Sequence, residues 1–138
     1  MTFTPTTILN QTGTVTLTDN AANSPQTVPI TAYGAEAAVD TSPASLTFPS
    51  QTVGTTSTAQ TITVQNYGNA TLTLSGVSIT GPFLISANTC GATLGAGLSC
   101  TISIKFKPTQ TGAANGNLVL NDNAGDSPQF VALSGTGS

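Results

Sequence analysis

Apolar and polar residues alternate along much of this chain with a period of two, which is the spacing of a β-strand with one buried face. The clearest run covers residues 100–106, where Cys, Ile, Ile and Phe alternate with Thr, Ser and Lys before Pro108 ends the run. A glycine-rich loop bounded by Cys90 and Cys100 comes directly before it. We expect this run to be the central, half-buried strand of a domain, with Cys100 on the core side and close to Cys90.

Other short runs of β-type residues are separated by Gly, Pro and Asn, in the manner of an all-β sandwich. We expect strands over residues 46–48, 61–65, 71–79, 83–85, 100–106, 117–121 and 130–134. The last two would form a closing hairpin around residues 122–128. No long segment has a convincing helical period, so the predicted fold class is all-β.

An internal repeat shows how the chain is organised, because residues 3–34 match residues 106–137 without a gap. Phe3 aligns with Phe106, which makes the offset 103 residues. Further matches follow in order at Pro5, Gly13, Leu17, Asp19–Ala21, Ser24–Gln26, Val28 and Gly34. The chain is therefore predicted to hold the C-terminal hairpin of an incomplete upstream repeat in residues 1–36, and a complete module in residues 37–138.

The predicted N-terminal hairpin has an apolar side that no other part of its own repeat covers. A lone hairpin is marginally stable in water, so we expect this side to find a partner. Packing on its own module, or on a neighbouring copy through strand addition or swapping, would supply one. The short junction over residues 35–40 favours the neighbour, so the expected partners are copies of the chain or neighbouring repeats. The predicted assembly surface consists of Phe3, Val15, Leu17, Val28 and Ile30.

Composition and charge exclude several classes of function. The chain is 38% hydrophobic and only 5% charged, with a formal net charge of −3. Lys105 and Lys107 are its only cations, so it lacks the basic surface that nucleic acids and anionic membranes require. No apolar run is long enough for a membrane-spanning helix, and residues 1–30 do not resemble a signal peptide.

The residues that a catalytic site would need are mostly missing from the sequence. The chain has no His and no Arg, so its many Ser residues have no base to activate them. The Asp/Asn loops at residues 19–23 and 122–126 could suggest calcium, but they hold too few ligands and fit hairpin turns better. We expect no enzyme activity, no metal and no cofactor. The five acidic residues fall in turns or at the junction, at Asp19, Glu36, Asp40, Asp122 and Asp126.

Cys90 and Cys100 are the only cysteines. A disulfide, two buried thiols and half of a metal site are the possible interpretations, and two Cys without His cannot complete a zinc site from this chain. We expect the disulfide, which would stabilise the fold by roughly 2–3 kcal/mol on the chain-entropy model and would require an oxidising compartment.

Four segments carry a resemblance to a known family: residues 42–54, 65–83, 90–106 and 116–137. Together they resemble the hydin-like immunoglobulin-fold modules called ASH domains, which are related to major sperm protein. The bacterial form, found in tandem in large exported proteins of the choice-of-anchor D type, is the most similar. The resemblance implies an immunoglobulin-like β-sandwich of seven to eight strands, a scaffolding role and no catalytic residues. Eukaryotic relatives are cytoplasmic, whereas the paired Cys and scarce charge here fit the exported branch.

The predicted function is therefore a non-enzymatic structural or adhesive repeat of an exported bacterial surface protein, acting as a spacer, stalk or fibre-forming unit. We expect an extracellular or cell-surface location, with the signal peptide and anchor outside this sequence. The alternative is a module that binds a glycan or a protein through loops at one end of the sandwich. Tyr33 and Tyr67 are the side chains that could stack on a sugar.

Overall fold

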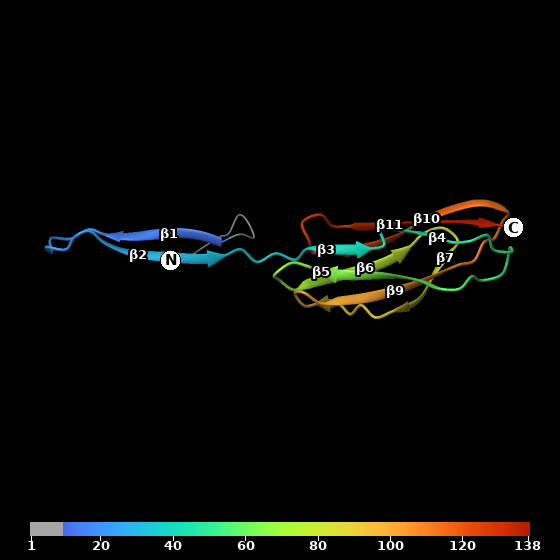
Figure 1. The fold of residues 1–138 in the computed structure, drawn as a ribbon, viewed down its shortest axis with the longest axis horizontal. Helices are drawn as coiled ribbons and strands as arrows, with labels where there is room; N and C mark the ends of the chain where they lie inside the picture. Colours follow the sequence, from blue (N-terminus) through green and yellow to red (C-terminus); the bar gives the residue numbers. More distant parts are fainter. Residues whose placement is uncertain (1–9) are drawn as a thin grey trace. The chain divides into compact units, whose positions relative to one another are not determined.

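A computed structural model describes residues 10–138. Every regular element in this range is a β-strand, and no helix forms there. The chain divides into two compact units, Met1–Glu36 and Ala37–Ser138. In the first, β1 (Asn10–Leu17) and β2 (Gln26–Tyr33) pair as an antiparallel hairpin, drawn in blue in Figure 1.

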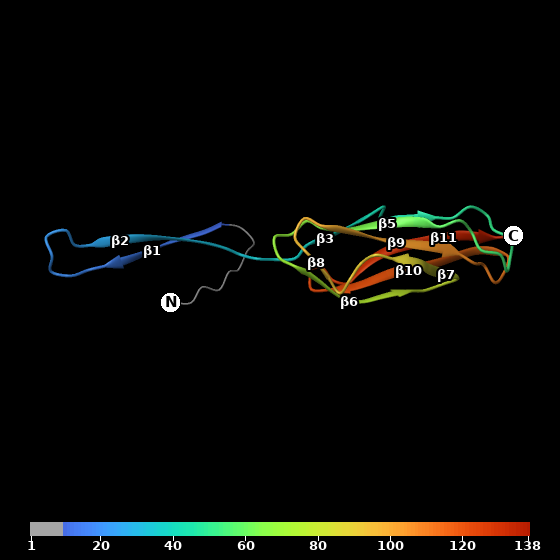
Figure 2. The same cartoon turned by 90° about the horizontal axis from the view of Figure 1, so that it is seen from below.

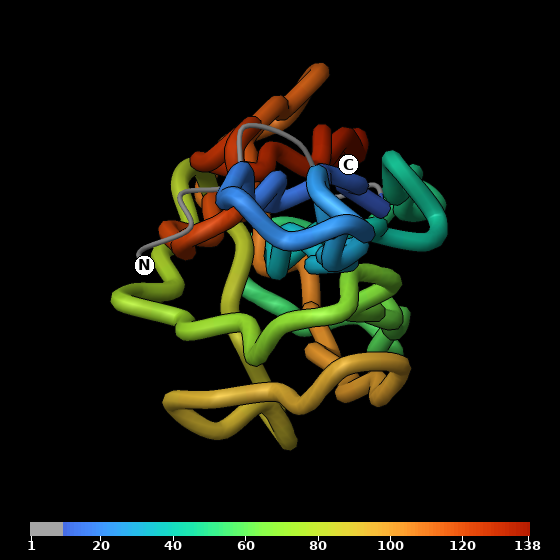
Figure 3. The backbone as a smooth tube through the Cα atoms, turned by 90° about the vertical axis from the view of Figure 1, so that its left-hand side faces the viewer, coloured from blue at the N-terminus to red at the C-terminus, as the bar shows by residue number. Residues whose placement is uncertain are grey.

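Residues 37–138, all of which the structure describes, form two sheets that pack face to face (Figures 1 and 2). The five-stranded sheet has the order β4 (Ser45–Thr47), β11 (Gln129–Gly137), β10 (Gly112–Asp122), β6 (Leu72–Ile79) and β8 (Thr93–Leu94). The four-stranded sheet has the order β3 (Val39–Ser42), β5 (Gln60–Asn66), β9 (Ser99–Phe106) and β7 (Phe83–Asn88). The view along the strands in Figure 3 separates β10 and β11, in orange-red, from the layer that contains β9. The predicted immunoglobulin-like β-sandwich is confirmed.

The core lies between the two sheets and follows from the period-two alternation. On β9, Cys100, Ile102, Ile104 and Phe106 face inward and are buried, whereas the residues between them are partly exposed. The inward positions of β5, β10 and β11 join the same apolar cluster. Burying each large aliphatic side chain favours folding by about 1.5–3 kcal/mol, so the inward positions of these four strands contribute strongly to the stability of the module.

Three phenylalanines fill one part of this core. The ring centroid of Phe106 lies 5.0 Å from that of Phe83 and 6.0 Å from that of Phe48. A β-carbon added at Gly135 would lie 2.7 Å from the Phe106 ring, so in this packing β11 has no room for a side chain at that position.

The strand predictions were incomplete at the edges of the sheets. The interpretation of residues 35–40 as a junction is wrong in part, because β3 begins at Val39, and Ala37 and Val39 are buried in the core. The two-residue strand β8 was also missed, and β10 begins at Gly112, earlier than expected. With β3 and β8 added to the seven predicted strands, the module contains nine. These segments have little apolar alternation, and their pairing with a neighbouring strand makes them strands.

Candidate functional site

The apolar side of the β1–β2 hairpin is the candidate assembly surface within the described residues. We call it the β1–β2 face. Val15 lies opposite Val28 in the antiparallel register. Leu17 and Val28 leave 54% and 50% of their surface exposed. Such large exposed fractions are unusual for aliphatic side chains arranged on one side of a strand pair, and they leave this side available for contact. The face consists of Gly13, Val15, Leu17, Val28 and Ile30; Phe3, the remaining predicted member, lies outside the described residues.

The opposite side of the hairpin is polar and rich in threonine. Its members alternate with those of the β1–β2 face along each strand, as the pleat requires. This two-sided pattern is that of a strand pair with one face in a core and one in water. The outer side contains Thr12, Thr14, Thr16, Thr27 and Thr31.

The β10–β11 hairpin has the same register as β1–β2 when the offset of 103 residues is applied. The pair Val15–Val28 corresponds to Leu118–Val131, and Leu17 corresponds to Leu120. In β10–β11 these side chains are fully buried in the core, with no exposed surface. Residues that the module buries completely thus have equivalents in the hairpin that are partly exposed, as Val15 is, or half exposed, as Leu17 and Val28 are.

The turns of the two hairpins also share their hydrogen bonds. The amide of Asp19 donates to Ser24 Oγ at 2.9 Å, and Asp19 Oδ1 accepts from the amide of Ala21 at 2.8 Å. The second turn has the same two bonds at the same lengths, formed by Asp122, Ser127 and Ala124. One oxygen of the Asp19 carboxylate and one of the Asp122 carboxylate therefore accept from local backbone, as expected for a hairpin turn.

Gly13 and Gly116 are equivalent positions in very different surroundings. A β-carbon at Gly116 would lie 2.2 Å from the carbonyl oxygen of Thr80 and 2.9 Å from the Phe83 ring. At Gly13 such a carbon would meet nothing within 4 Å. Neither glycine has a positive φ, so the backbone conformation does not require glycine at position 116. The lack of room for a side chain does. Nothing in the described hairpin explains Gly13.

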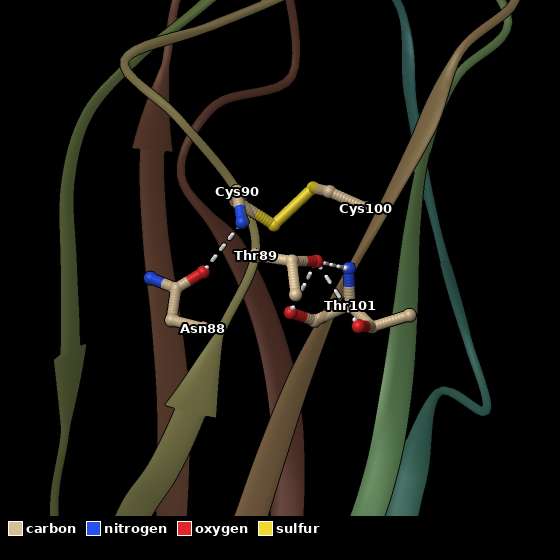
Figure 4. Close-up of a disulfide and its surroundings, with 5 residues drawn as sticks. All are labelled: Asn88, Thr89, Cys90, Cys100 and Thr101. Atoms are coloured by element: carbon tan, nitrogen blue, oxygen red, sulfur yellow. Dashed lines mark hydrogen bonds between the residues drawn. A yellow bond between two sulfur atoms is a disulfide. The ribbon is translucent and has the colours of Figure 1, made fainter.

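The disulfide expected from the sequence is present. Cys90 and Cys100 are bonded, with their Cα atoms 5.0 Å apart (Figure 4). Next to the bridge, the hydroxyl of Thr89 accepts from the amide of Thr101 at 2.8 Å, and Asn88 Oδ1 accepts from the amide of Cys90 at 2.8 Å. The bridge and these bonds fix the loop that leads into β9.

Asn66 was not singled out by the sequence analysis, although it organises one end of the module. Its side chain is fully buried. Oδ1 accepts from the amides of Ala38 and Gly68, and Nδ2 donates to the carbonyls of Ala70 and Leu94 at 2.8 and 3.0 Å. One amide group thus joins the entry to β3, the turn after β5 and the disulfide loop. An Asn at the end of a strand reads as an ordinary turn residue, and only burial distinguishes this one.

The remaining candidate side chains do not form a cluster in the module. Tyr33 ends β2, and Tyr67 follows β5; both are exposed. Lys105 lies on the partly exposed side of β9, and Lys107 follows the strand. Among the described residues there is no group of three His, Cys, Asp or Glu side chains placed to hold a metal ion. None of the described residues belongs to a helix suited to crossing a membrane.

Comparison with known proteins identifies the fold family. The sequence profile described as "Abnormal spindle-like microcephaly-assoc'd, ASPM-SPD-2-Hydin" matches residues 37–130. The chain belongs to the ASH family. No curated protein matches it.

Solved structures agree on the fold at low sequence identity. The human CEP192 PapD-like domain 7, an ASH domain, is 18% identical with a TM-score of 0.59, over 72% of this chain and 84% of that one. A Porphyromonas gingivalis W83 protein of unknown function is 16% identical with a TM-score of 0.60, over 96% and 68%. The secreted serine protease VesC of Vibrio cholerae is 18% identical with a TM-score of 0.53, and the match covers 66% of this chain but 21% of VesC. ASH domains are an immunoglobulin-like, non-catalytic fold family.

Proposed function

We propose that this ASH chain is a structural repeat of an exported bacterial surface protein of the choice-of-anchor D type, and that it works as a spacer or stalk. The observation that carries the proposal is the placement of the two chain ends in residues 37–138. The chain enters this unit at one end of the sandwich and leaves at the other (Figures 1 and 2). When units of this kind are joined in series, their lengths add, and the array holds the segment that it carries at a distance.

Backbone hydrogen bonds fix both ends of the module. At the entry, the amide of Tyr67 donates to the carbonyl of Ala38 at 2.9 Å. At the exit, the amide of Ser138 donates to the carbonyl of Gln51 at 2.9 Å, and the amide of Val53 donates to the carbonyl of Ser138 at 2.9 Å. The backbone is therefore hydrogen-bonded to the sandwich at both Ala38 and Ser138, which limits free movement between successive units.

The strand arrangement suits a chain that is pulled from its ends. β3, the first strand of the module, pairs with β5 over four residues, and β11, the last strand, pairs with β10 over nine. A force along the long axis acts parallel to these strands, so it loads the hydrogen bonds of each pair together and does not break them one at a time. The module should resist extension better than its modest size suggests.

The Cys90–Cys100 bridge supports an exported location, since disulfides persist in oxidising compartments. The low charge adds to this, because a surface with 5% charged residues changes little with pH. The assignment to the choice-of-anchor D type rests on the sequence resemblance of the four segments.

Single-molecule pulling tests the spacer role. Handles at positions 38 and 138 load the module along its axis, whereas handles at positions 38 and 97 load it at one end, because the amide of Gly97 donates to the carbonyl of Asn66 there. We expect a higher unfolding force, and slower unfolding at a given force, for the first pair. Equal, low forces for both pairs would contradict the proposal.

One observation favours recognition of a ligand as a second function. Tyr67 and Leu98 are both exposed and lie at the entry end, where the amide of Asn66 donates to the carbonyl of Leu98. A glycan or a protein surface could bind to them. Reproducible binding of the intact chain on a glycan array, abolished by Tyr67→Ala, would establish this function in place of the spacer.

A further inference from the structure

The β10–β11 hairpin shows what covers an apolar side like the β1–β2 face. The equivalent side of β10–β11 belongs to one apolar cluster with the inward residues of β5 and β9. Its side chains include Leu118, Leu120 and Val131, and none of these has exposed surface. In the one hairpin of this type that is covered in the described residues, β10–β11, the apolar side packs against a sheet that contains β5 and β9.

Gly13 supplies an independent observation. In the module, Gly116 is required because the backbone of Thr80 and the ring of Phe83 press against β10 at that point. Gly in a strand interior weakens the strand unless another group approaches closely. Gly13 has no such neighbour and no positive φ, so nothing in the described hairpin requires a glycine that weakens its strand. A close neighbour that is absent from the described residues accounts for it.

We infer that the β1–β2 face is completed by a preceding sandwich of the same kind, with strands equivalent to β5 and β9 against Val15, Leu17, Val28 and Ile30. A turn equivalent to Thr80–Phe83 lies over Gly13. The hairpin is then the closing hairpin of that sandwich, as β10–β11 closes its own. This inference rests on the proposed role as a repeat in a series, and it names the partner of the assembly surface.

A second copy of the chain is a poorer occupant for this face. The β5 and β9 strands of such a copy are already covered by its own β10–β11 hairpin. Exchange would replace Leu118 with the smaller Val15, and it would place Ala32 at the position of Gly135, where a β-carbon lies 2.7 Å from the Phe106 ring. The incoming hairpin would therefore fill the core less well than the one it displaces.

The test extends the chain in register. Because Phe3 aligns with Phe106, a second copy of residues 37–105 placed directly before Phe3 rebuilds a whole sandwich without any change in spacing. Ala32→Gly is made in this extended chain and in the 138-residue chain, because Ala32 is the equivalent of Gly135, which has no room for a β-carbon beside the Phe106 ring. Hydrogen exchange of β1 and β2 is then compared between this extended chain and the 138-residue chain. We expect the amide exchange of the hairpin to slow by at least about 1,000-fold on extension, because a covered hairpin opens only when its sandwich unfolds.

Gly13→Ala tests directly whether a neighbouring group lies against position 13. In the 138-residue chain the added methyl group meets open space, so the melting temperature of residues 37–138 should not fall. In the extended chain the same substitution should lower the melting temperature of the rebuilt sandwich by several degrees. Gly116→Ala is the matched control, because its methyl group collides with Thr80 in both chains.

Three outcomes overturn the inference. The first is unchanged exchange of β1–β2 in the extended chain. The second is a neutral Gly13→Ala in that chain. The third is a stable dimer of the 138-residue chain by light scattering, with slow exchange in the hairpin, which would make a second copy the occupant. The pulling experiment loads only residues 38–138, so failure of the spacer proposal can be told apart from failure of this inference.

Discussion

The two hairpins of this chain have nearly the same sequence pattern, the same register and the same turn bonds, yet they differ in what surrounds them. The β10–β11 hairpin buries Leu120 completely, whereas β1–β2 leaves Leu17 54% exposed at the equivalent position. The local structure of a hairpin is therefore set by its own residues, through alternation and turn chemistry. Its contribution to stability depends on the sheet that lies against it, because buried area carries the free energy.

The largest expected effect comes from truncating the same leucine in each hairpin. Leu120→Ala removes a fully buried side chain and should lower the free energy of unfolding by about 2–5 kcal/mol. Leu17→Ala, its matched control, removes a half-exposed one and should change the main unfolding transition by less than about 0.5 kcal/mol. Denaturant titration of the 138-residue chain measures both. Losses of similar size would show that both hairpins belong to one core.

A smaller effect is expected from the disulfide, which lies in only one of the two units. Reduction of Cys90–Cys100 should lower the stability of residues 37–138 by about 2–3 kcal/mol while the β-rich circular dichroism spectrum persists, because the bridge closes a loop outside most of the core. Hydrogen exchange of β1 and β2 should stay the same. Labelling of both thiols in the native, unreduced protein would contradict the assignment.

The smallest effect concerns the turns. Ser127→Ala removes the acceptor of the Asp122 amide and should lower the free energy of unfolding of the module by about 0.5–1.5 kcal/mol. Ser24→Ala removes the same bond from the other turn and should leave the main thermal transition in place, since the hairpin carries little buried area. Thermal melts of the two variants compare them directly. A loss after Ser24→Ala as large as that after Ser127→Ala would mean that the β1–β2 turn is coupled to the module.

The sequence was most informative where a strand lies in the middle of a sheet. The alternation in β5, β9, β10 and β11 predicted which side chains point inward, because a strand with one buried face must place its apolar residues at every second position. The internal repeat predicted that residues 3–34 and 106–137 share a local structure, and the matching registers of β1–β2 and β10–β11 bear this out for the described part.

Sequence reasoning was least informative at the edges and at polar core positions. β3 and β8 are short, and they are strands because β5 and β6 offer them free backbone groups. Asn66 looks like any turn residue until its four partners are brought together from separate segments. No local pattern contains that information.

The sequence by itself determined the all-β class, the internal repeat and the disulfide partners, because each depends on residue type and spacing. Only the tertiary structure decided which equivalent residues are buried, since burial depends on segments far apart in the chain. Gly13 and Gly116 show this most simply. The two glycines are identical in sequence, and the backbone of Thr80 is what makes one of them necessary.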